Sequence, residues 1–506
     1  MTHNWTTLLI AGLLACGNGG SAPDSGPRDA STDVAIDAPL GEDAAVDSAV
    51  DGGADSSVDA GEDAGVETCG PSGDDASGTD VIEDENGRAT VVVTDRDRCH
   101  RSYTLTSTAS LRDGEPDNPR VIVEDPASPT TRTGNDMFDA LHALALEEVR
   151  ECAVDQIRDG AFNDGAPLDC GEGGCFETGR LWHYVWTRDT AYSVDLGLAP
   201  LDPLRSRNSL ERKISERRTG GDLQIVQDTG SGGSYPVSTD RVSWALGAEA
   251  LLHQLQGAQR ESFAARAFDA IRNTLEHDRR IAFDETDGLY RGEQSFLDWR
   301  EQSYPEWTQS DTVHLGMSKA LSTNLLHNNA MRVASRLAEE RGETALRDRY
   351  RAWADAHEMA IQRSFWLEDE GLFSTFLTTT LDASATRRFD LLGSALAVIL
   401  GVATDAQAAR IVASYPHYGP ATSVHWPQQQ FTPIYHNRGE WPFVDAYWLR
   451  AAAQAGNDAV ADRMVRALMR GAAINLSNME NFEAASGAPF VDEGESSGPI
   501  VNSQRQ

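Results

Sequence analysis

The chain has 506 residues and a formal net charge of −36, with 43 Lys and Arg against 79 Asp and Glu. A chain of this length can bury a large core, so we expect one large domain with additional segments. The negative charge argues against nucleic acid as a partner, because phosphate backbones bind basic surfaces. Residues 17–68 hold thirteen acidic residues and one arginine, and the remainder of the chain is only mildly acidic.

Residues 1–16 have the pattern of an export signal. The apolar run Leu8–Ala15 is too short to span a bilayer and ends on small residues before Cys16. Together with the leucines and alanine before it, Cys16 resembles the lipidated cysteine of a bacterial lipobox, and Gly17 resembles an outer-membrane sorting signal. We expect an exported lipoprotein, periplasmic or on the cell surface, that touches the outer membrane only through its lipid anchor. A cleaved signal or a misassigned start is the alternative.

Residues 17–75 are a low-complexity segment of Asp, Ala, Gly, Ser and Val. Aspartates recur every four residues from Asp43 to Asp63, so a helix would align like charges on one face, and glycines interrupt the stretch. We expect a solvated, disordered acidic tether. Calcium loops are excluded, because their ligands recur at every second position.

Five cysteines follow the lipobox, namely Cys69, Cys99, Cys152, Cys170 and Cys175. Export makes disulfides possible. Cys170 and Cys175 could close a small loop, while Cys99 could pair with Cys69 or with Cys152. The spacing fits no zinc site, and we expect no metal and no cofactor.

A short β arm is predicted over residues 76–134. Residues 88–95 and 101–108 are rich in β-branched side chains and are predicted to form two strands separated by a polar turn. Prolines then mark an extended connector from Pro116 to Pro129. The arm has no obvious core of its own.

Apolar residues follow a helical period from residue 135 onward, with Asp136 placed to cap the first helix. The pattern predicts helices over 135–159, 187–198, 203–218, 239–257, 260–277, 319–340, 343–366, 390–401, 404–414, 441–455 and 457–474. They come in pairs with few strands between them, which favours an all-α (α/α)6 toroid of helical hairpins over residues 135–506. Twelve helices complete such a barrel, so we expect the last one to be lacking.

The loops of this toroid collect polar and aromatic residues. In the first, Trp186 can stack on a sugar ring while Arg188 and Asp189 grip its hydroxyls; the alternative is an ordinary helix start with a surface ion pair. The second, residues 228–241, is glycine-rich but lacks the lysine and preceding strand of a phosphate loop. It is better interpreted as a substrate loop that ends at Asp240 and Arg241.

Two further regions supply carboxylates. Asp298 lies between Leu297 and Trp299, an environment that raises a pKa and keeps a proton available; in the alternative, Asp298 or Glu301 simply pairs with Arg300. Segments 435–443 and 478–487 offer Glu440 and Glu480. Hydrolysis of a glycosidic bond needs two such groups, one to protonate the leaving oxygen and one to activate water or attack.

These motifs resemble those of the six-hairpin glycosidases, the (α/α)6-barrel group with glucoamylases, trehalases and the α-glucosidases of glycoside hydrolase family 63. Trp186-Thr187-Arg188-Asp189 is similar to a Trp-x-Arg-Asp segment that holds sugar hydroxyls. Glu293-x-Ser295-x-x-Asp298-Trp299 resembles an acid loop, commonly Glu-Ser-Gly-x-Asp, with one extra residue. Glu480-Asn481-Phe482-Glu483-x-x-Ser486-Gly487 resembles Glu-Asn-Tyr-Asn-x-x-Thr-Gly, whose Glu is the base.

The resemblance implies a role for each site residue. Asp298 is the expected acid, with Glu301 open as an alternative, and Glu480 is the expected base, with Glu440 open as an alternative. The residues expected to bind an oligosaccharide are Trp186, Arg188, Asp189, Asp240, Arg241, Trp299, Arg300, His436, Asn437 and Trp441.

The expected function is inverting hydrolysis of α-linked gluco-oligosaccharides. Another sugar enzyme on the same toroid, such as a rhamnosidase or an epimerase, remains an alternative. A polysaccharide lyase would use one of His183, His425 and His436. A non-catalytic carbohydrate-binding lipoprotein is the alternative from a different class.

Overall fold

The computed structural model describes residues 81–94, 96, 98–111, 116–158, 165–179, 183–216, 221–228, 235, 237–295, 311–378, 384–417, 419, 421–428 and 436–488. The predictions for the export signal, the tether and the last helix concern residues outside these ranges. Within the described ranges, no helix is both long enough and apolar enough to cross a membrane.

Helices make up most of the described chain. They are α1 (Asp136–Glu151), α2 (Thr187–Ser193), α3 (Ala199–Leu201), α4 (Pro203–Glu211), α5 (Trp244–Gln254), α6 (Gly257–Ile281), α8 (Thr312–Met317), α9 (Leu321–Glu340), α10 (Thr344–Phe365), α11 (Leu391–Ile399), α12 (Asp405–Ser414), α13 (Pro442–Gln454) and α14 (Asp458–Asn475), with a π-helical turn η3 (Val194–Leu198) and a 3₁₀ turn η4 (Asp240–Ser243). All eleven predicted helical segments are confirmed, and the short α3 and α8 were not predicted.

Two details of these helices differ from the prediction. Asn135 caps α1, because its side chain accepts a hydrogen bond from the Phe138 backbone N–H at 3.0 Å, while Asp136 pairs with Arg96. The segments predicted over 135–159 and 203–218 end early, at Glu151 and Glu211, because a short strand follows each of them.

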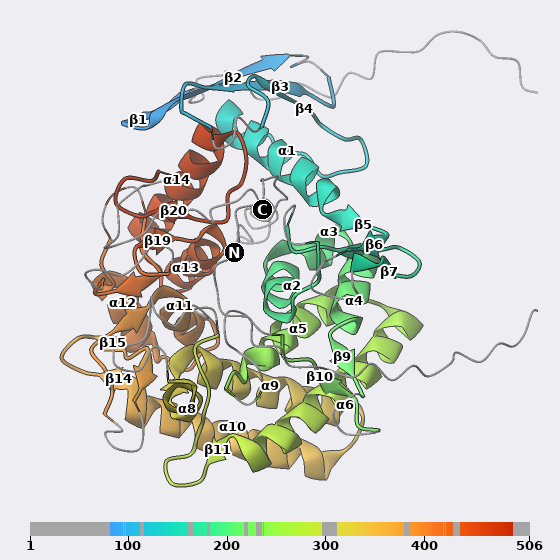
Figure 1. The fold of residues 1–506 in the computed structure, drawn as a ribbon, viewed down its shortest axis with the longest axis vertical. Helices are drawn as coiled ribbons and strands as arrows, with labels where there is room; N and C mark the ends of the chain where they lie inside the picture. The colour runs from blue at the N-terminus through green and yellow to red at the C-terminus, as the bar shows by residue number, and fades with distance from the viewer. Residues whose placement is uncertain are drawn as a thin grey trace, which may run out of the picture.

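The helices form a toroid (Figure 1). Helices α2, α5, α9, α11 and α13 follow one another side by side around the inner ring, and α4, α6, α10, α12 and α14 lie outside them. Burial explains this division: eight of the nine residues of α11 are buried, whereas α6 is amphipathic and buries only eight of its 25 residues. The predicted all-α (α/α)6 toroid is therefore confirmed.

Side chains of α13 meet those of α2 and η3 across the inner ring. The rings of Tyr192 and Phe443 stack with their centroids 5.4 Å apart. Asp195 Oδ2 accepts hydrogen bonds from Tyr447 Oη and Arg450 Nη1, both at 2.7 Å. These contacts tie the first inner helix to α13.

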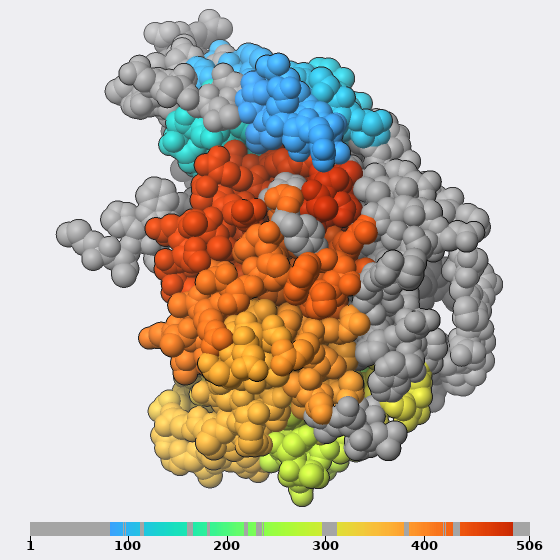
Figure 2. Space-filling view, turned by 90° about the vertical axis from the view of Figure 1, so that its left-hand side faces the viewer, coloured from blue at the N-terminus to red at the C-terminus, as the bar shows by residue number. Residues whose placement is uncertain are grey.

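A four-stranded antiparallel sheet lies against the toroid. Its strands are β1 (Val81–Asp84), β2 (Gly87–Thr94), β3 (Ser102–Ser107) and β4 (Arg120–Val123), in that order. The two predicted strands are confirmed as β2 and β3, and β4 lies within the predicted connector. The inner face of the sheet shares its apolar core with α1 and α14, so the first strands and the last helix lie together (Figure 2).

Short strand pairs link the loops of the toroid. They are β5 (Ala153–Val154) with β8 (Cys175–Phe176), β6 (Gln156–Ile157) with β7 (Leu168–Asp169), β9 (Ile214–Ser215) with β10 (Gln224–Ile225), β11 (Phe283–Asp284) with β12 (Leu289–Tyr290), β13 (Lys319–Ala320) with β16 (Phe376–Leu377), β14 (Trp366–Leu367) with β15 (Leu372–Phe373), β17 (Phe389–Asp390) with β18 (His425–Trp426), and β19 (Gly439–Glu440) with β20 (Phe482–Glu483). A disulfide joins Cys170 to Cys175, one of the predicted alternatives.

A buried ion pair joins the sheet to the toroid. Arg120 of β4 contacts Glu148 of α1 at 2.6 Å, and its Nη1 also donates to the Leu476 carbonyl at 2.9 Å. The Glu148 side chain is fully buried and also accepts hydrogen bonds from Ser477 and Asn478. One carboxylate therefore holds the strand, the helix and the segment after α14.

We expect Glu148→Ala to lower the free energy of unfolding by about 3 kcal/mol, because it removes the buried partner of Arg120. Glu147→Ala is the matched control: Glu147 also pairs with Arg120, but its side chain is 28% exposed, and its loss should cost less than about 1 kcal/mol. Urea denaturation of both variants measures the difference. Equal losses would contradict this role of Glu148.

Candidate active site

The loops that precede the inner helices are joined at one end of the toroid by backbone hydrogen bonds. The bonds run from Glu293 N to Val237 O, Gly292 N to Ser318 O, Leu321 N to Thr375 O, Thr375 N to Arg388 O, Leu391 N to Val424 O and Val424 N to Gly439 O, each at 2.8–3.0 Å. The β19–β20 pair continues them. We call these linked segments the loop belt. Six of the described candidate site residues lie on the belt or within four residues of it in sequence, namely Asp240, Arg241, His436, Asn437, Trp441 and Glu480. The other three, Trp186, Arg188 and Asp189, lie at the start of α2.

Arg188 connects three of these loops. Its Nε lies 3.3 Å from Asp240 Oδ2, and its Nη1 lies 3.4 Å from the Ser295 carbonyl oxygen. Gln227 Nε2 donates to the other Asp240 oxygen at 2.6 Å. The guanidinium is therefore held in one orientation, with Asp240 as a charged partner.

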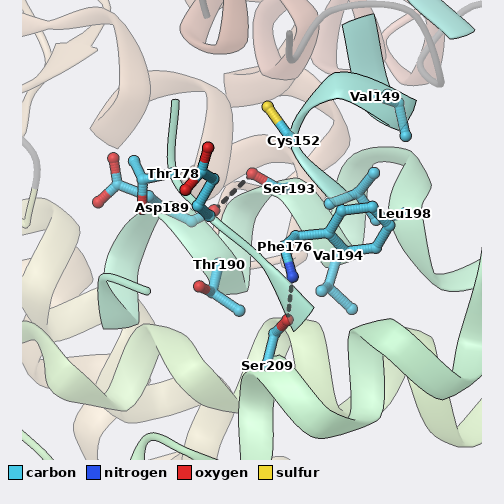
Figure 3. Close-up of a pocket in the computed structure, with 11 residues that line it drawn as sticks. Val149, Cys152, Phe176, Thr178, Asp189, Thr190, Ser193, Val194, Leu198 and Ser209 are labelled. Atoms are coloured by element: carbon cyan, nitrogen blue, oxygen red, sulfur yellow. Dashed lines mark hydrogen bonds between the residues drawn. The ribbon is translucent and has the colours of Figure 1, made fainter. Parts of the chain in front are cut away.

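Asp189 lines a separate pocket (Figure 3). The pocket lies between the end of α1, β8 and the face of α2, η3 and α4, and much of its lining is apolar, with Val149, Val194 and Leu198 among the lining side chains. Glu177 also lines it, where burial raises the pKa of its carboxyl despite a hydrogen bond with His183. Of the described candidate residues, Asp189 alone lines this pocket.

Arg241 does not join the other candidates. Its side chain is fully buried, and Nη2 lies 2.5 Å from Asp278 of α6. Burial by itself raises the pKa of Asp278, but Arg241 and His327 outweigh it, and the pKa lies below its ordinary value. Arg241 therefore ties the start of α5 to the outer helix α6, and this position does not support the predicted contact with a substrate.

The structure fixes the start of the predicted acid loop. Glu293 accepts a hydrogen bond from Ser238, and the Ser295 backbone N–H donates to Ser322 Oγ at 3.0 Å. At Gly292, with φ +136°, a Cβ would lie 2.5 Å from Thr239 Oγ1, so only glycine fits. The acid-loop residues Asp298, Trp299, Arg300 and Glu301 lie outside the described residues.

Glu480 follows a segment that α1 holds in place. Both the backbone N–H and Nδ2 of Asn478 donate to Glu148 Oε2, at 3.1 and 2.8 Å. Two residues after Glu480, Phe482 pairs with Glu440 in the β19–β20 register. Glu480 is 5% exposed. The predicted base is thus fixed from both sides of its segment.

The aromatic loop lies on the other strand of this pair. His436 and Trp441 pack with ring centroids 4.9 Å apart, and Trp441 contacts Phe443 edge to face. Ala484 N donates to the Arg438 carbonyl at 2.9 Å, which draws this loop to the Glu480 segment. Asn437 is also buried here. His436, Asn437, Trp441 and Glu480 are therefore brought together.

Sequence reasoning missed Asp390 and Arg388 as site residues. Asp390 caps α11, and burial raises its pKa to about 6. It accepts a hydrogen bond from Thr375 Oγ1 at 2.7 Å, and Thr375 in turn contacts Gln294 of the acid loop. The signal was present, because an aspartate directly before an apolar helical run is a typical cap.

His425 pairs with Asp390 across the β17–β18 register. Burial, with a smaller effect of Arg388, lowers the pKa of His425 to about 3, so its imidazole is neutral. Within the described part of the chain, no group of three or more His, Cys, Asp and Glu side chains could hold a metal ion.

A toroid whose inner-helix loops bring together a fixed arginine, buried carboxylates and stacked aromatics has the architecture of a six-hairpin glycoside hydrolase domain. Residues 182–496 match the family described as "Mannosylglycerate hydrolase MGH1-like glycoside hydrolase domain". The chain belongs to this family, and the predicted resemblance to six-hairpin glycosidases is confirmed.

Similar solved structures include three glycosidases. A family 78 rhamnosidase of a Bacillus species is 19% identical (TM-score 0.46), and the match covers 64% of this chain and 30% of that one. A family 63 mannosylglycerate hydrolase from Thermus thermophilus is 15% identical (0.44; 60% and 88%). Neutral trehalase from Saccharomyces cerevisiae is 13% identical (0.45; 68% and 74%). The match thus spans under a third of the rhamnosidase, and no curated protein sequence matches the chain.

The ion pairs Arg188–Asp240 and Arg241–Asp278 predict different effects when each arginine is replaced. Arg241→Met leaves Asp278 buried without its main partner and should destabilise the fold by about 3 kcal/mol. Arg188→Met also removes the cation beside a buried carboxylate, but Gln227 still donates to Asp240, so the melting temperature should fall less than in the Arg241 variant. It should lower kcat/KM for a hydrolysed glycoside by about 100-fold, because positioning is lost. Thermal melts and initial rates of both variants give the comparison. A stable but inactive Arg241→Met variant would contradict the structural role of Arg241 and favour a role in substrate binding.

Proposed function

We propose that this chain hydrolyses α-linked gluco-oligosaccharides with inversion at the anomeric carbon. Glu480 is the general base that deprotonates water, and Asp298 is the general acid that protonates the leaving oxygen. The placement of Glu480 carries the proposal: a carboxylate that is 5% exposed, on a segment held by Glu148 and paired with the Trp441 loop.

The contacts of Arg188 support the same site. Asp240 and the Ser295 carbonyl fix its guanidinium where the acid loop begins. A fixed cation can bind sugar hydroxyls without paying the entropy of ordering a long side chain on binding. Trp186 and Arg188 are both partly exposed, so they are accessible to a ligand. In an inverting enzyme the carboxyls of Asp298 and Glu480 lie about 6.5–9.5 Å apart.

We expect Asp298→Asn and Glu480→Gln each to lower turnover of α-glucosides by about 10⁴-fold or more while sugar binding persists, because each removes one proton transfer. Glu483→Gln is the matched control in the same segment: its carboxylate accepts from Ser486 N at 2.6 Å, and its loss should cost less than about tenfold. Initial rates measure turnover in each variant, and calorimetry measures whether each variant still binds the sugar. Near-normal turnover in either site variant would remove that residue from its role.

NMR of the first sugar released from α-linked disaccharides tests the stereochemistry. A β-anomer supports inversion, and an α-anomer contradicts it. An unsaturated uronate from polysaccharide substrates would favour a lyase instead. Binding without turnover of any substrate would favour a carbohydrate-binding protein.

One observation favours a second candidate, hydrolysis of a glycoside whose aglycone carries a carboxylate. Arg388 is partly buried on the loop belt, and burial without a nearby acid lowers its pKa. Within the described residues its side chain contacts His425, with 3.5 Å between Nη1 and Nε2, and no carboxylate. A desolvated cation without a counter-ion suits an anionic ligand, and mannosylglycerate, named in the family description, provides one.

For this candidate we expect Arg388→Met to raise KM for mannosylglycerate by roughly 30-fold, about 2 kcal/mol, because a charge-assisted hydrogen bond is lost. KM for a neutral α-glucoside should stay unchanged. Arg387→Met is the matched control, since Arg387 is exposed and paired with Glu370. Steady-state kinetics with both substrates measure these KM values. If the two variants change KM for mannosylglycerate equally, Arg388 does not recognise a carboxylate.

A further inference from the structure

Two carboxyl groups lie buried together behind the Glu480 segment. Glu440 ends β19 and is 2% exposed, and Asp445 lies in the first turn of α13 and is fully buried. Glu440 Oε1 and both Asp445 oxygens accept no hydrogen bond from the described part of the protein. Three buried acceptors without a donor would cost several kcal/mol if nothing satisfied them.

A proton shared between the two carboxyls supplies the missing donor. The groups lie close enough for each to act on the ionisation of the other. Burial raises the pKa of Glu440 to about 7, and burial together with Glu440 raises the pKa of Asp445 well above its ordinary value. Two like charges in a dry site cannot both persist, so one carboxyl donates its O–H to the other.

The surrounding charges do not replace this proton. Arg470 of α14 lowers the pKa of Glu440, but its Nε and Nη1 bind Asp84 of β1 and the Gly487 carbonyl, and its buried Nη2 makes no hydrogen bond to the described residues. Glu483 of β20 acts in the opposite direction and pairs with Arg438 at 3.6 Å. Neither reaches the three acceptor oxygens with a hydrogen bond.

We propose that Glu440 and Asp445 form a proton-sharing pair that locks β19 to the first turn of α13 and thereby positions Glu480. The positioning part rests on the proposed role of Glu480 as base. The link is short: Glu440 pairs with Phe482, two residues from Glu480, and the Phe482 ring packs on Gly471 of α14, where a Cβ would lie 2.8 Å from it. Glu440 is then a positioning residue, because its carboxyl is occupied by Asp445.

The pair makes stability depend on pH in a defined direction. Both groups have a raised pKa in the fold, so the unfolded chain ionises first as pH rises. The stabilisation is complete below about pH 4, the ordinary range of carboxyl groups. It declines as pH rises and is lost for Glu440 as pH passes its folded pKa of about 7. Above that value the pair carries charge and loosens β19.

Variants of Glu440 test the pair in the full chain. Gln keeps the shape and supplies an N–H donor to Asp445, whereas Ala leaves Asp445 without one. Glu368→Gln is the control, since that side chain is 76% exposed. The infrared carbonyl band of a protonated carboxylic acid at pH 6.5 should be present in the wild type and in the control, and weaker in Glu440→Gln.

Between pH 5 and 8, the melting temperature of the wild type should fall relative to that of Glu440→Gln. At pH 8, kcat/KM should be at least about tenfold higher in Glu440→Gln than in Glu440→Ala. An unchanged infrared band, parallel melting curves, or a transition that moves with added Na⁺, K⁺ or Ca²⁺ would overturn the proposal. The infrared and melting measurements need no substrate. They therefore decide on the pair even if Glu480 proves not to be a base, and in that case only the positioning part fails.

Discussion

The candidate site depends on the loop belt, the chain of backbone hydrogen bonds that joins the loops before α5, α9, α11 and α13. Buried loops carry N–H and C=O groups that must find partners, and here the partners are the neighbouring loops. The starts of these four inner helices are therefore fixed relative to one another. Side chains that are far apart in sequence, such as Arg188 and Ser295, can then hold a contact of a few ångströms.

The N-terminal sheet contributes to the same site from outside the toroid. Glu148 reaches Ser477 and Asn478 across more than 300 residues of sequence, and Arg120 holds Glu148 from the sheet side. Because the Glu480 segment is held by α1 on one side and by β19 on the other, its backbone has little freedom. The sheet is thus part of the support of the candidate active site, although it has no core separate from α1 and α14.

The sequence predicts the helices well, because each is long and has a regular apolar period. It predicts side-chain direction poorly. Arg241 stands beside Asp240 in sequence, but neighbouring residues of a 3₁₀ turn point about 120° apart, so one contacts Arg188 and the other α6. Glu440 stands out in sequence as the alternative candidate for the base. Its partner Asp445, however, becomes visible only when the strand meets the helix.

Burial at the belt disfavours the charged forms of ionisable groups: Asp390 and Glu440 have raised pKa values, and His425 has a lowered one. Arg188 remains charged, held against Asp240, and Arg388 remains without a carboxylate partner among the described residues. Because both arginines are partly buried, the field of each cation is screened less than it would be at an exposed surface. The same desolvation that makes the Glu440–Asp445 pair retain a proton therefore strengthens the pull of Arg188 and Arg388 on a substrate.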